Sequence, residues 1–236
     1  MMAILEIKDL VVGYGAFPVL HGIDFVVEEG EVCVLLGLNG AGKTTTVTTI
    51  AGLLRPTSGQ VLFEGSPLGR KPPSSRVKSG ISLSPEGRRV FPRMTVGQNL
   101  KLGAWSQRRS PALVKRQMKL VLDYFPRLAE REHQIAGTLS GGEQQMLAVA
   151  RAMMSNPKLL IIDEASLGLS PTLARVVWEA TARIASDGTT VLMVEQNAGA
   201  LPFADRALVM EKGTLIRTAV GEDVKNLDVR AAYLGA

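Results

Sequence analysis

The sequence predicts an α/β fold with a β-rich N-terminal part and a helical insert, and three observations support this prediction. Continuous apolar runs in KLLIIDE and TTVLMVE are typical of strands buried on both faces of a parallel sheet. Apolar residues recur at helical spacing after residue 85, and a glycine-rich stretch stands between a strand-like and a helix-like run. The 236 residues, 46% hydrophobic and 21% charged, suit one large domain or two small ones.

Short β-rich runs form the first part of the chain. ILEIKDLVV and DFVVEEGEVCVLLG come first, and GQVLFEG follows. Glu28, Glu29 and Gly30 separate two strand-like pieces, so we expect a hairpin turn there. Near the other end, RALVMEKGTLIRTA is expected to form a second hairpin that turns at Lys212 and Gly213.

Helical periodicity marks residues 86–155 as an insert between the strand-rich parts. Apolar residues form two stripes, each along one face of a predicted helix, and we expect both stripes to pack in the core. The stripes consist of Val114, Met118, Val121, Leu122 and Phe125, and of Met146, Val149, Ala150 and Met153.

Charge and cysteine usage restrict the class of protein. The formal net charge is +5, with basic residues concentrated in EGRRVFPR and WSQRRSPALVKRQMK. Such clusters fit a nucleotide, a nucleic acid or a lipid headgroup as partner, or a solvated helix face, which we favour for the second stretch. The single cysteine, Cys33, excludes a disulfide within the chain and indicates a reducing compartment.

The N-terminal segment MMAILEIKDLVV does not resemble a secretory signal. Lys8 and Asp9 come too early for an apolar signal core, and no apolar stretch approaches the roughly 18 residues that a membrane helix needs. We therefore expect a soluble protein, or one attached to a membrane through partners.

The most specific motif is GLNGAGKT, which fits the phosphate-binding pattern G-x-x-x-x-G-K-[ST] between the strand EVCVLL and the helix TTTVTTIAGLL. Glycines let the backbone N–H groups face the phosphates of a nucleotide, Lys43 reaches the β and γ oxygens, and the Thr44 hydroxyl ligates Mg²⁺. ATP and Mg²⁺ are thus the expected ligands. The residues expected to bind the nucleotide are Gly37, Asn39, Gly40, Ala41, Gly42, Lys43, Thr44 and Thr45.

Two carboxylates follow the buried strand of KLLIIDE, where ligand crevices of parallel sheets lie. Asp163 is predicted to hold Mg²⁺ through water. Glu164 points elsewhere and is predicted to be the general base that polarises the attacking water.

A second glycine-led stretch, LSGGEQQ, also predicts an anion site, because Ser140 and two glycines at a helix start leave backbone N–H groups pointing outward. The three motifs in this order resemble the ATP-binding cassette (ABC) family, and the resemblance covers essentially the whole chain. It implies a P-loop NTPase fold of the ABC ATPase type in a single domain, 1–236. Residues 1–85 and 156–236 would form a RecA-like part with a β subdomain, and 86–155 a helical subdomain.

The resemblance also explains why the chain has two phosphate sites. In this family the signature completes the ATP site of a second cassette subunit, so that two head-to-tail subunits enclose two ATP molecules. This implies that Ser140, Gly141 and Gly142, followed by Glu143, contact the nucleotide held by the partner subunit. The loop from Ser166 to Leu169 is similar to the one that contacts the other subunit across the dimer.

Further site residues are implied by the resemblance, and three positions depart from the family pattern. Tyr14 is similar to the aromatic residue that stacks on adenine. Glu86 stands where most cassettes have a glutamine that senses Mg²⁺, and its carboxylate can still ligate the metal. Gln196 replaces the histidine that holds the γ-phosphate, and it can donate a hydrogen bond but carries no charge. Ala165 replaces a common proline, with little effect expected.

Closer resemblance to ATP-binding subunits of branched-chain amino acid importers, of the LivF type, rests on PEGRRVFP, LSGGEQQMLAVARAM, DEASLGLSP, VEQNA and a final RAAYLG. It implies transmembrane permease partners, an indirect link to a substrate-binding protein, no nucleic acid, and a place at the cytoplasmic face of the inner membrane. An importer for a related amino acid, an amide or urea is the alternative. A soluble cassette ATPase of DNA repair or translation, or a nucleotide-dependent module that hydrolyses ATP poorly, is a more distant one.

Overall fold

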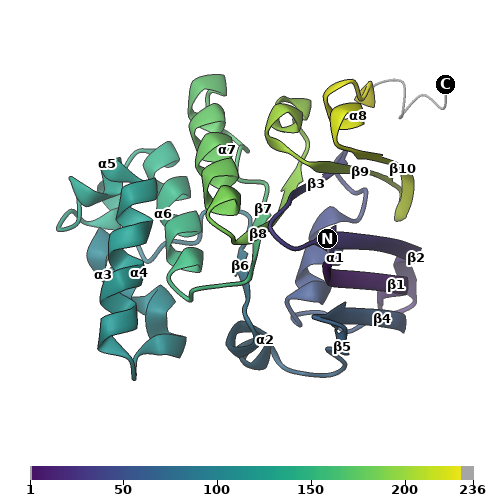
Figure 1. The fold of residues 1–236 in the computed structure, drawn as a ribbon, viewed down its shortest axis with the longest axis horizontal. Coiled ribbons are helices and arrows are strands. Elements are labelled where there is room, and N and C mark those ends of the chain that lie inside the picture. The colour runs from purple at the N-terminus through teal and green to yellow at the C-terminus, as the bar shows by residue number, and fades with distance from the viewer. Residues whose placement is uncertain (1, 230–236) are drawn as a thin grey trace.

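The structure is a computed structural model that describes residues 2–229. Figure 1 shows three parts side by side: a small antiparallel sheet at one end, a larger sheet in the middle, and a group of helices at the other end. The final RAAYLG motif lies outside the described residues.

The small sheet has four strands in the order β2-β1-β4-β5. Its strands are β1 (Ala3–Tyr14), β2 (Phe17–Glu28), β4 (Ser58–Phe63) and β5 (Ser66–Pro67). The antiparallel pair of β1 and β2 closes at Tyr14 and Phe17, which are register partners. The predicted β-rich start is confirmed.

The larger sheet has six strands in the order β10-β9-β3-β8-β7-β6. The strands are β3 (Val32–Gly37), β6 (Ile81–Ser84), β7 (Leu159–Asp163), β8 (Thr190–Glu195), β9 (Arg206–Glu211) and β10 (Thr214–Val220). Only the β10–β9 pair is antiparallel, and it turns at Lys212 and Gly213, both of which have left-handed backbone angles. The two buried parallel strands and this hairpin were predicted correctly.

The hairpin expected at Glu28–Gly30 is wrong. β2 pairs with β1 in the small sheet, whereas β3 lies between β8 and β9 in the large one. Buried and exposed residues alternate in much of β2, while every residue of β3 is buried. Since a strand covered on both faces belongs inside a parallel sheet, the turn carries the chain from one sheet to the other.

Helices pack on both faces of the large sheet. They are α1 (Lys43–Ile50), α2 (Pro73–Ser79), α3 (Val96–Gly103), α4 (Pro111–Tyr124), α5 (Pro126–Ala129), α6 (Gly141–Met153), α7 (Pro171–Ser186) and α8 (Glu222–Lys225). The described residues also form short 3₁₀ turns: η1 (Ala104–Gln107) and η2 (Ala136–Thr138) lie between helices, and η3 (Ala198–Phe203) lies between β8 and β9.

Two apolar cores lie on opposite faces of the large sheet. One joins α1 and the small sheet to the sheet face that contains Cys33, and the other joins the remaining sheet face to α3, α4, α6 and α7. The stripe on α6 is buried, and on α4 Val121 and the adjacent Phe125 are buried while the other members pack half-buried on the same core. Both predicted stripes are therefore confirmed as core.

No helix within residues 2–229 is long and apolar enough to cross a membrane.

Candidate functional site

The glycine-rich loop runs from the end of β3 to the start of α1 and is held by its own lysine. Lys43 is 4% exposed, and its Nζ donates to the carbonyl oxygens of Gly37 at 2.9 Å and Leu38 at 3.1 Å. A Cβ on Gly37 would lie 2.9 Å from the Met210 carbonyl oxygen, so only glycine allows this close approach. Gly42 begins α1 with φ 108°, a left-handed angle that favours glycine.

The loop is also tied to the strands around it. The Gly213 N–H donates to the Ala41 carbonyl at 2.8 Å, and the His21 N–H donates to the Gly213 carbonyl at 3.0 Å. The β9–β10 turn thus bridges the loop and β2. The loop is therefore fixed by hydrogen bonds that do not depend on a ligand.

Asp163 ends β7 directly beside the start of α1. The Thr44 hydroxyl lies 3.4 Å from Asp163 Oδ1, and Asp163 is 1% exposed. Burial, with the negative charges of Glu164 and Glu86, raises the pKa of Asp163 to about 6, although the Thr44 hydrogen bond and Lys43 oppose the shift. Hydroxyl and carboxylate oxygens gathered in this way suit Mg²⁺, which prefers oxygen ligands.

Glu164 and Gln196 form a hydrogen-bonded cluster over Lys43. Lys43 Nζ lies 3.1 Å from Glu164 Oε1, and Gln196 Nε2 lies 2.9 Å from both carboxylate oxygens. The same amide nitrogen is 2.7 Å from Asn39 Oδ1. Glu164 has φ 50°, a left-handed angle that non-glycine residues rarely adopt and that is often found at functional sites.

A cavity of about 450 Å³ lies over this cluster. Ten of the predicted site residues line it: Tyr14, Asn39, Gly40, Gly42, Lys43, Thr44, Thr45, Glu86, Glu164 and Gln196. Gly37 and Ala41 belong to the same loop but do not line the cavity. Asp163 does not line it either, but it is hydrogen-bonded to Thr44, which does. Val19 and Leu167 also line it and were not predicted.

The signature residues do not line this cavity but form the N-terminal turn of α6. Ser140 is the N-cap: its Oγ accepts from the Glu143 N–H at 3.4 Å, while Glu143 Oε2 accepts from the Ser140 N–H at 2.9 Å. Arg131 pairs with Glu143 at 3.1 Å. Burial acts to raise the pKa of Glu143, but these Ser140 hydrogen bonds and the basic neighbours lower it overall.

The two signature glycines face different neighbours. A Cβ on Gly142 would lie 2.8 Å from Leu173 Cδ1, at the contact with α7. A Cβ on Gly141 would lie 2.8 Å from Arg88 Nη2. Gly142 therefore serves helix packing, and Gly141 leaves room for an arginine.

Glu195 is a polar residue of the site region that the sequence analysis missed. It is 1% exposed at the end of β8 and accepts hydrogen bonds from the Ser166 N–H at 3.2 Å, the Ser166 hydroxyl, and Trp178 Nε1 at 3.1 Å. Burial raises its pKa although these hydrogen bonds oppose the shift. The sequence signal that could have indicated Glu195 is its position as the acidic last residue of the apolar run TTVLMVE.

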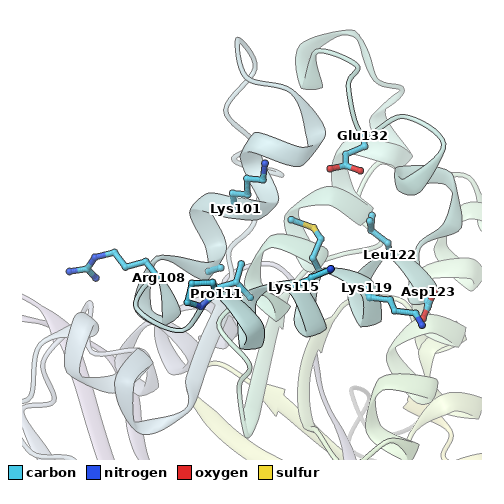
Figure 2. Close-up of a pocket in the computed structure, with 11 residues that line it drawn as sticks. Lys101, Arg108, Pro111, Lys115, Lys119, Leu122, Asp123 and Glu132 are labelled. Atoms are coloured by element: carbon cyan, nitrogen blue, oxygen red, sulfur yellow. The ribbon is translucent and has the colours of Figure 1, made fainter.

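A larger cavity, of about 760 Å³, lies elsewhere, along α3, η1 and α4 (Figure 2). Its lining includes the apolar side chains of Val114, Met118 and Leu122. Lys115 and Lys119, on the same helix α4, also line it. No predicted site residue lines it. The smaller cavity is the candidate nucleotide site, because phosphate binding needs the backbone N–H groups and the lysine of a loop such as the one that lines it.

The family follows from comparison with known proteins. The ABC transporter family model matches residues 20–167. The chain belongs to the ABC transporter family. The high-affinity branched-chain amino acid transport ATP-binding protein BraG of Pseudomonas aeruginosa is 46% identical over 224 residues, 94% of this chain and 95% of BraG. The probable branched-chain amino acid transport ATP-binding protein LivF of Archaeoglobus fulgidus is 36% identical over 203 residues, 85% of each chain.

Solved structures of ABC cassettes have the same fold. The ADP conformation of an ATP-binding cassette of an ABC transporter superposes with a TM-score of 0.88 at 29% identity, and each chain is covered completely. A nucleotide-free cassette gives 0.87 at 28% identity, again over both whole chains. This ABC transporter chain is thus a nucleotide-binding ATPase, and the predicted fold class and enzyme class are confirmed.

Proposed function

We propose that this ABC ATPase is the ATP-binding subunit of an importer for branched-chain or related amino acids. The observation that carries the proposal is the near full-length similarity to BraG, supported by LivF and by a third relative, the probable branched-chain amino acid transport ATP-binding protein LivG of Methanocaldococcus jannaschii. An importer for urea or amides is the alternative, because substrate choice lies with other subunits of such a system.

In this proposal the 450 Å³ cavity binds Mg-ATP. The loop from Gly37 to Thr45 cradles the phosphates, Lys43 contacts the β and γ oxygens, and exposed Tyr14 stacks on the adenine. Thr44 and Asp163, with Glu86 across the cavity, would hold Mg²⁺, which would offset the phosphate charge. The all-oxygen donor set and the excess of negative charge around Asp163 fit that ion.

Glu164 is the proposed general base, and Gln196 the residue that positions the reacting groups. The carboxylate lies beside the loop lysine, and the Gln196 amide fixes its orientation through contacts to both oxygens. A base acts on a water only from within hydrogen-bond reach, so holding the carboxylate in one place favours the chemical step.

A second cassette subunit is the proposed partner at the signature. The N-terminal turn of α6 presents Ser140 and Gly141 outside the cavity of its own chain. Backbone N–H groups at a helix start bind anions. In a head-to-tail dimer they would contact the ATP of the other subunit.

A permease would dock beside the loop that carries Glu86. A cavity of about 420 Å³ there is bordered by the exposed aromatic rings of Phe91 and Trp105 and by Arg151. Arg151 lies over the Phe91 ring, and its Nη1 is buried without a hydrogen-bond partner in the described part of the chain. Aromatic and arginine side chains are enriched at interfaces, so a permease segment with acceptor oxygens fits this place. Such docking would hold the protein at the cytoplasmic face of the membrane.

The test is uptake of labelled solutes by cells that lack this chain. We expect loss of ATP-dependent uptake of leucine, isoleucine or valine, restored by the wild-type chain but not by an equally expressed Glu164→Gln chain. Loss of urea or amide uptake with normal amino acid uptake would establish the alternative. Normal uptake of all these solutes would contradict the proposal.

A further inference from the structure

The loop from Glu86 to Arg89, which follows β6, has an unusual backbone. Gly87, Arg88 and Arg89 have φ angles of 83°, 64° and 48°, so two consecutive arginines adopt a left-handed conformation. Such conformations cost free energy for residues with a Cβ and are found where the surrounding structure enforces them. The backbone is thus bent so that Glu86 and Arg88 reach different places.

The Arg88 guanidinium lies against Gly141 of the signature. A Cβ on Gly141 would be 2.8 Å from Arg88 Nη2 and 3.0 Å from both Cζ and Nη1. Any larger residue at 141 would therefore displace this group. Glu86, two residues earlier, lines the ATP cavity of the same chain. One short loop thus touches both phosphate-binding regions.

Arg88 has no polar partner in this position. It is half-buried, and within residues 2–229 its guanidinium makes no hydrogen bond or ion pair. Glu143, the nearby acid in the first turn of α6, is engaged by Ser140 and Arg131. Arg89 differs, because it is exposed and its Nε donates to the Glu86 carbonyl at 3.3 Å.

A further anion would stabilise the Arg88 cation at this place, because Glu143, the acid of the same helix turn, is already paired with Arg131. The N-terminus of a 13-residue helix carries partial positive charge, so Arg88 is repelled by the helix that it covers. An anion between them would be attracted by both and would satisfy the free guanidinium N–H groups. In the proposed ATP cavity, Gln196 carries no charge, and the cation Lys43 is already paired with Glu164.

We propose that Arg88 contacts the γ-phosphate of the ATP held by the second subunit, together with the signature N–H groups. The proposal rests on the head-to-tail dimer of the proposed function. Arg88 of one subunit then gives the γ-phosphate in the other subunit's site a positive charge, which the neutral Gln196 of that site cannot give. Because Glu86 faces the chain's own nucleotide, the same loop connects the two ATP sites of the dimer.

The test compares Arg88→Ala with Arg89→Ala, each combined with Glu164→Gln so that bound ATP is not hydrolysed. Both substitutions remove a guanidinium from adjacent left-handed positions. Sedimentation in Mg-ATP measures dimer formation, alone or with the cognate second cassette, and nucleotide titration at low protein concentration measures ATP binding to the monomer.

We expect Arg88→Ala to raise the dimer dissociation constant about tenfold or more, as loss of a hydrogen bond to a charged group predicts, and to leave monomer affinity for ATP within about twofold. Arg89→Ala should change neither by more than about twofold. Arg88→Lys should recover part of the dimer, since it keeps the charge but not the planar donor pair.

Three outcomes would overturn the inference. Equal dimerisation of the two arginine variants removes the role of Arg88. Weaker ATP binding by the Arg88→Ala monomer would instead place Arg88 at the ATP site of its own chain. If Glu164→Gln forms no ATP-dependent dimer, even with its second cassette, the dimer of the proposed function fails and the inference fails with it.

Discussion

Helices α1 and α6 both have glycine at their N-terminal ends, Gly42 as the N-cap of α1 and Gly141 as the first residue of α6, but their surroundings differ. The start of α1 lies among polar side chains from the ends of β7 and β8, with Lys43 and Asp163 almost fully buried. The start of α6 has fewer polar neighbours: Arg88 lies beside Gly141, and Arg131 pairs with the capping Glu143. The carboxyl end of the parallel sheet gathers polar groups from several strands around one helix start, whereas α6 begins away from that edge and has fewer such groups.

The largest expected effect is that of Lys43→Ala, which removes the only cation of the glycine-rich loop. We expect loss of tight ATP binding and of hydrolysis, because the β and γ oxygens lose their charged donor. Nucleotide titration and phosphate release measure the two effects. Near-normal turnover would show that ATP is not hydrolysed at the start of α1.

Glu164→Gln should separate binding from chemistry. We expect turnover to fall about a hundredfold or more, as for loss of a general base, while ATP stays bound and the dimer accumulates. Single-turnover hydrolysis and sedimentation in Mg-ATP are the measurements. Rapid hydrolysis in this variant would exclude Glu164 as the base.

Gln196→Ala should have a smaller effect, of about tenfold on turnover. One positioning hydrogen bond to a charged group contributes about 1.5 to 3 kcal/mol, and Gln196 makes this contact to Glu164. Gln196→His should add a step to the pH–rate profile near about pH 6 to 7, since imidazole titrates there and the amide does not. Unchanged turnover of Gln196→Ala would make this residue a spectator.

Ser140→Ala should have the smallest effect, and only at the start of α6. Loss of the N-cap is expected to lower the free energy of unfolding by about 1 kcal/mol, or the Tm by about 2 to 4 °C. Monomer affinity for ATP should not change, because Ser140 does not line the cavity. A reduced affinity would mean that the two helix starts act on one nucleotide within one chain.

Much of the fold could be predicted from the sequence because its signals are local. Runs such as KLLIIDE indicate a strand buried on both faces, and GLNGAGKT requires a strand before it and a helix after it. The Glu28–Gly30 turn was misjudged because a turn does not reveal which sheet receives the next strand. In the structure, the pairing of β3 with β8 and β9 and the burial of all its residues show that β3 belongs to the large sheet.

The candidate site was predicted in part for the same reason. Lys43, Asp163 and Glu164 follow from motif chemistry. The contact between Arg88 and Gly141 joins residues far apart in the sequence and depends on two left-handed backbone angles, neither of which the sequence shows. Glu195 resembles an ordinary strand end until Ser166 and Trp178 are seen to donate to it.

The ion pair between Lys43 and Glu164 would make the activity of the proposed general base depend on bound nucleotide. Lys43 has three N–H donors, and the Gly37 carbonyl, the Leu38 carbonyl and Glu164 accept them. A phosphate oxygen that takes the lysine must displace one acceptor, and the carboxylate is the only one that is not part of the loop backbone. On the proposed function, ATP would therefore take Lys43 away from Glu164 as it binds, and binding of the nucleotide would free the proposed base for hydrolysis.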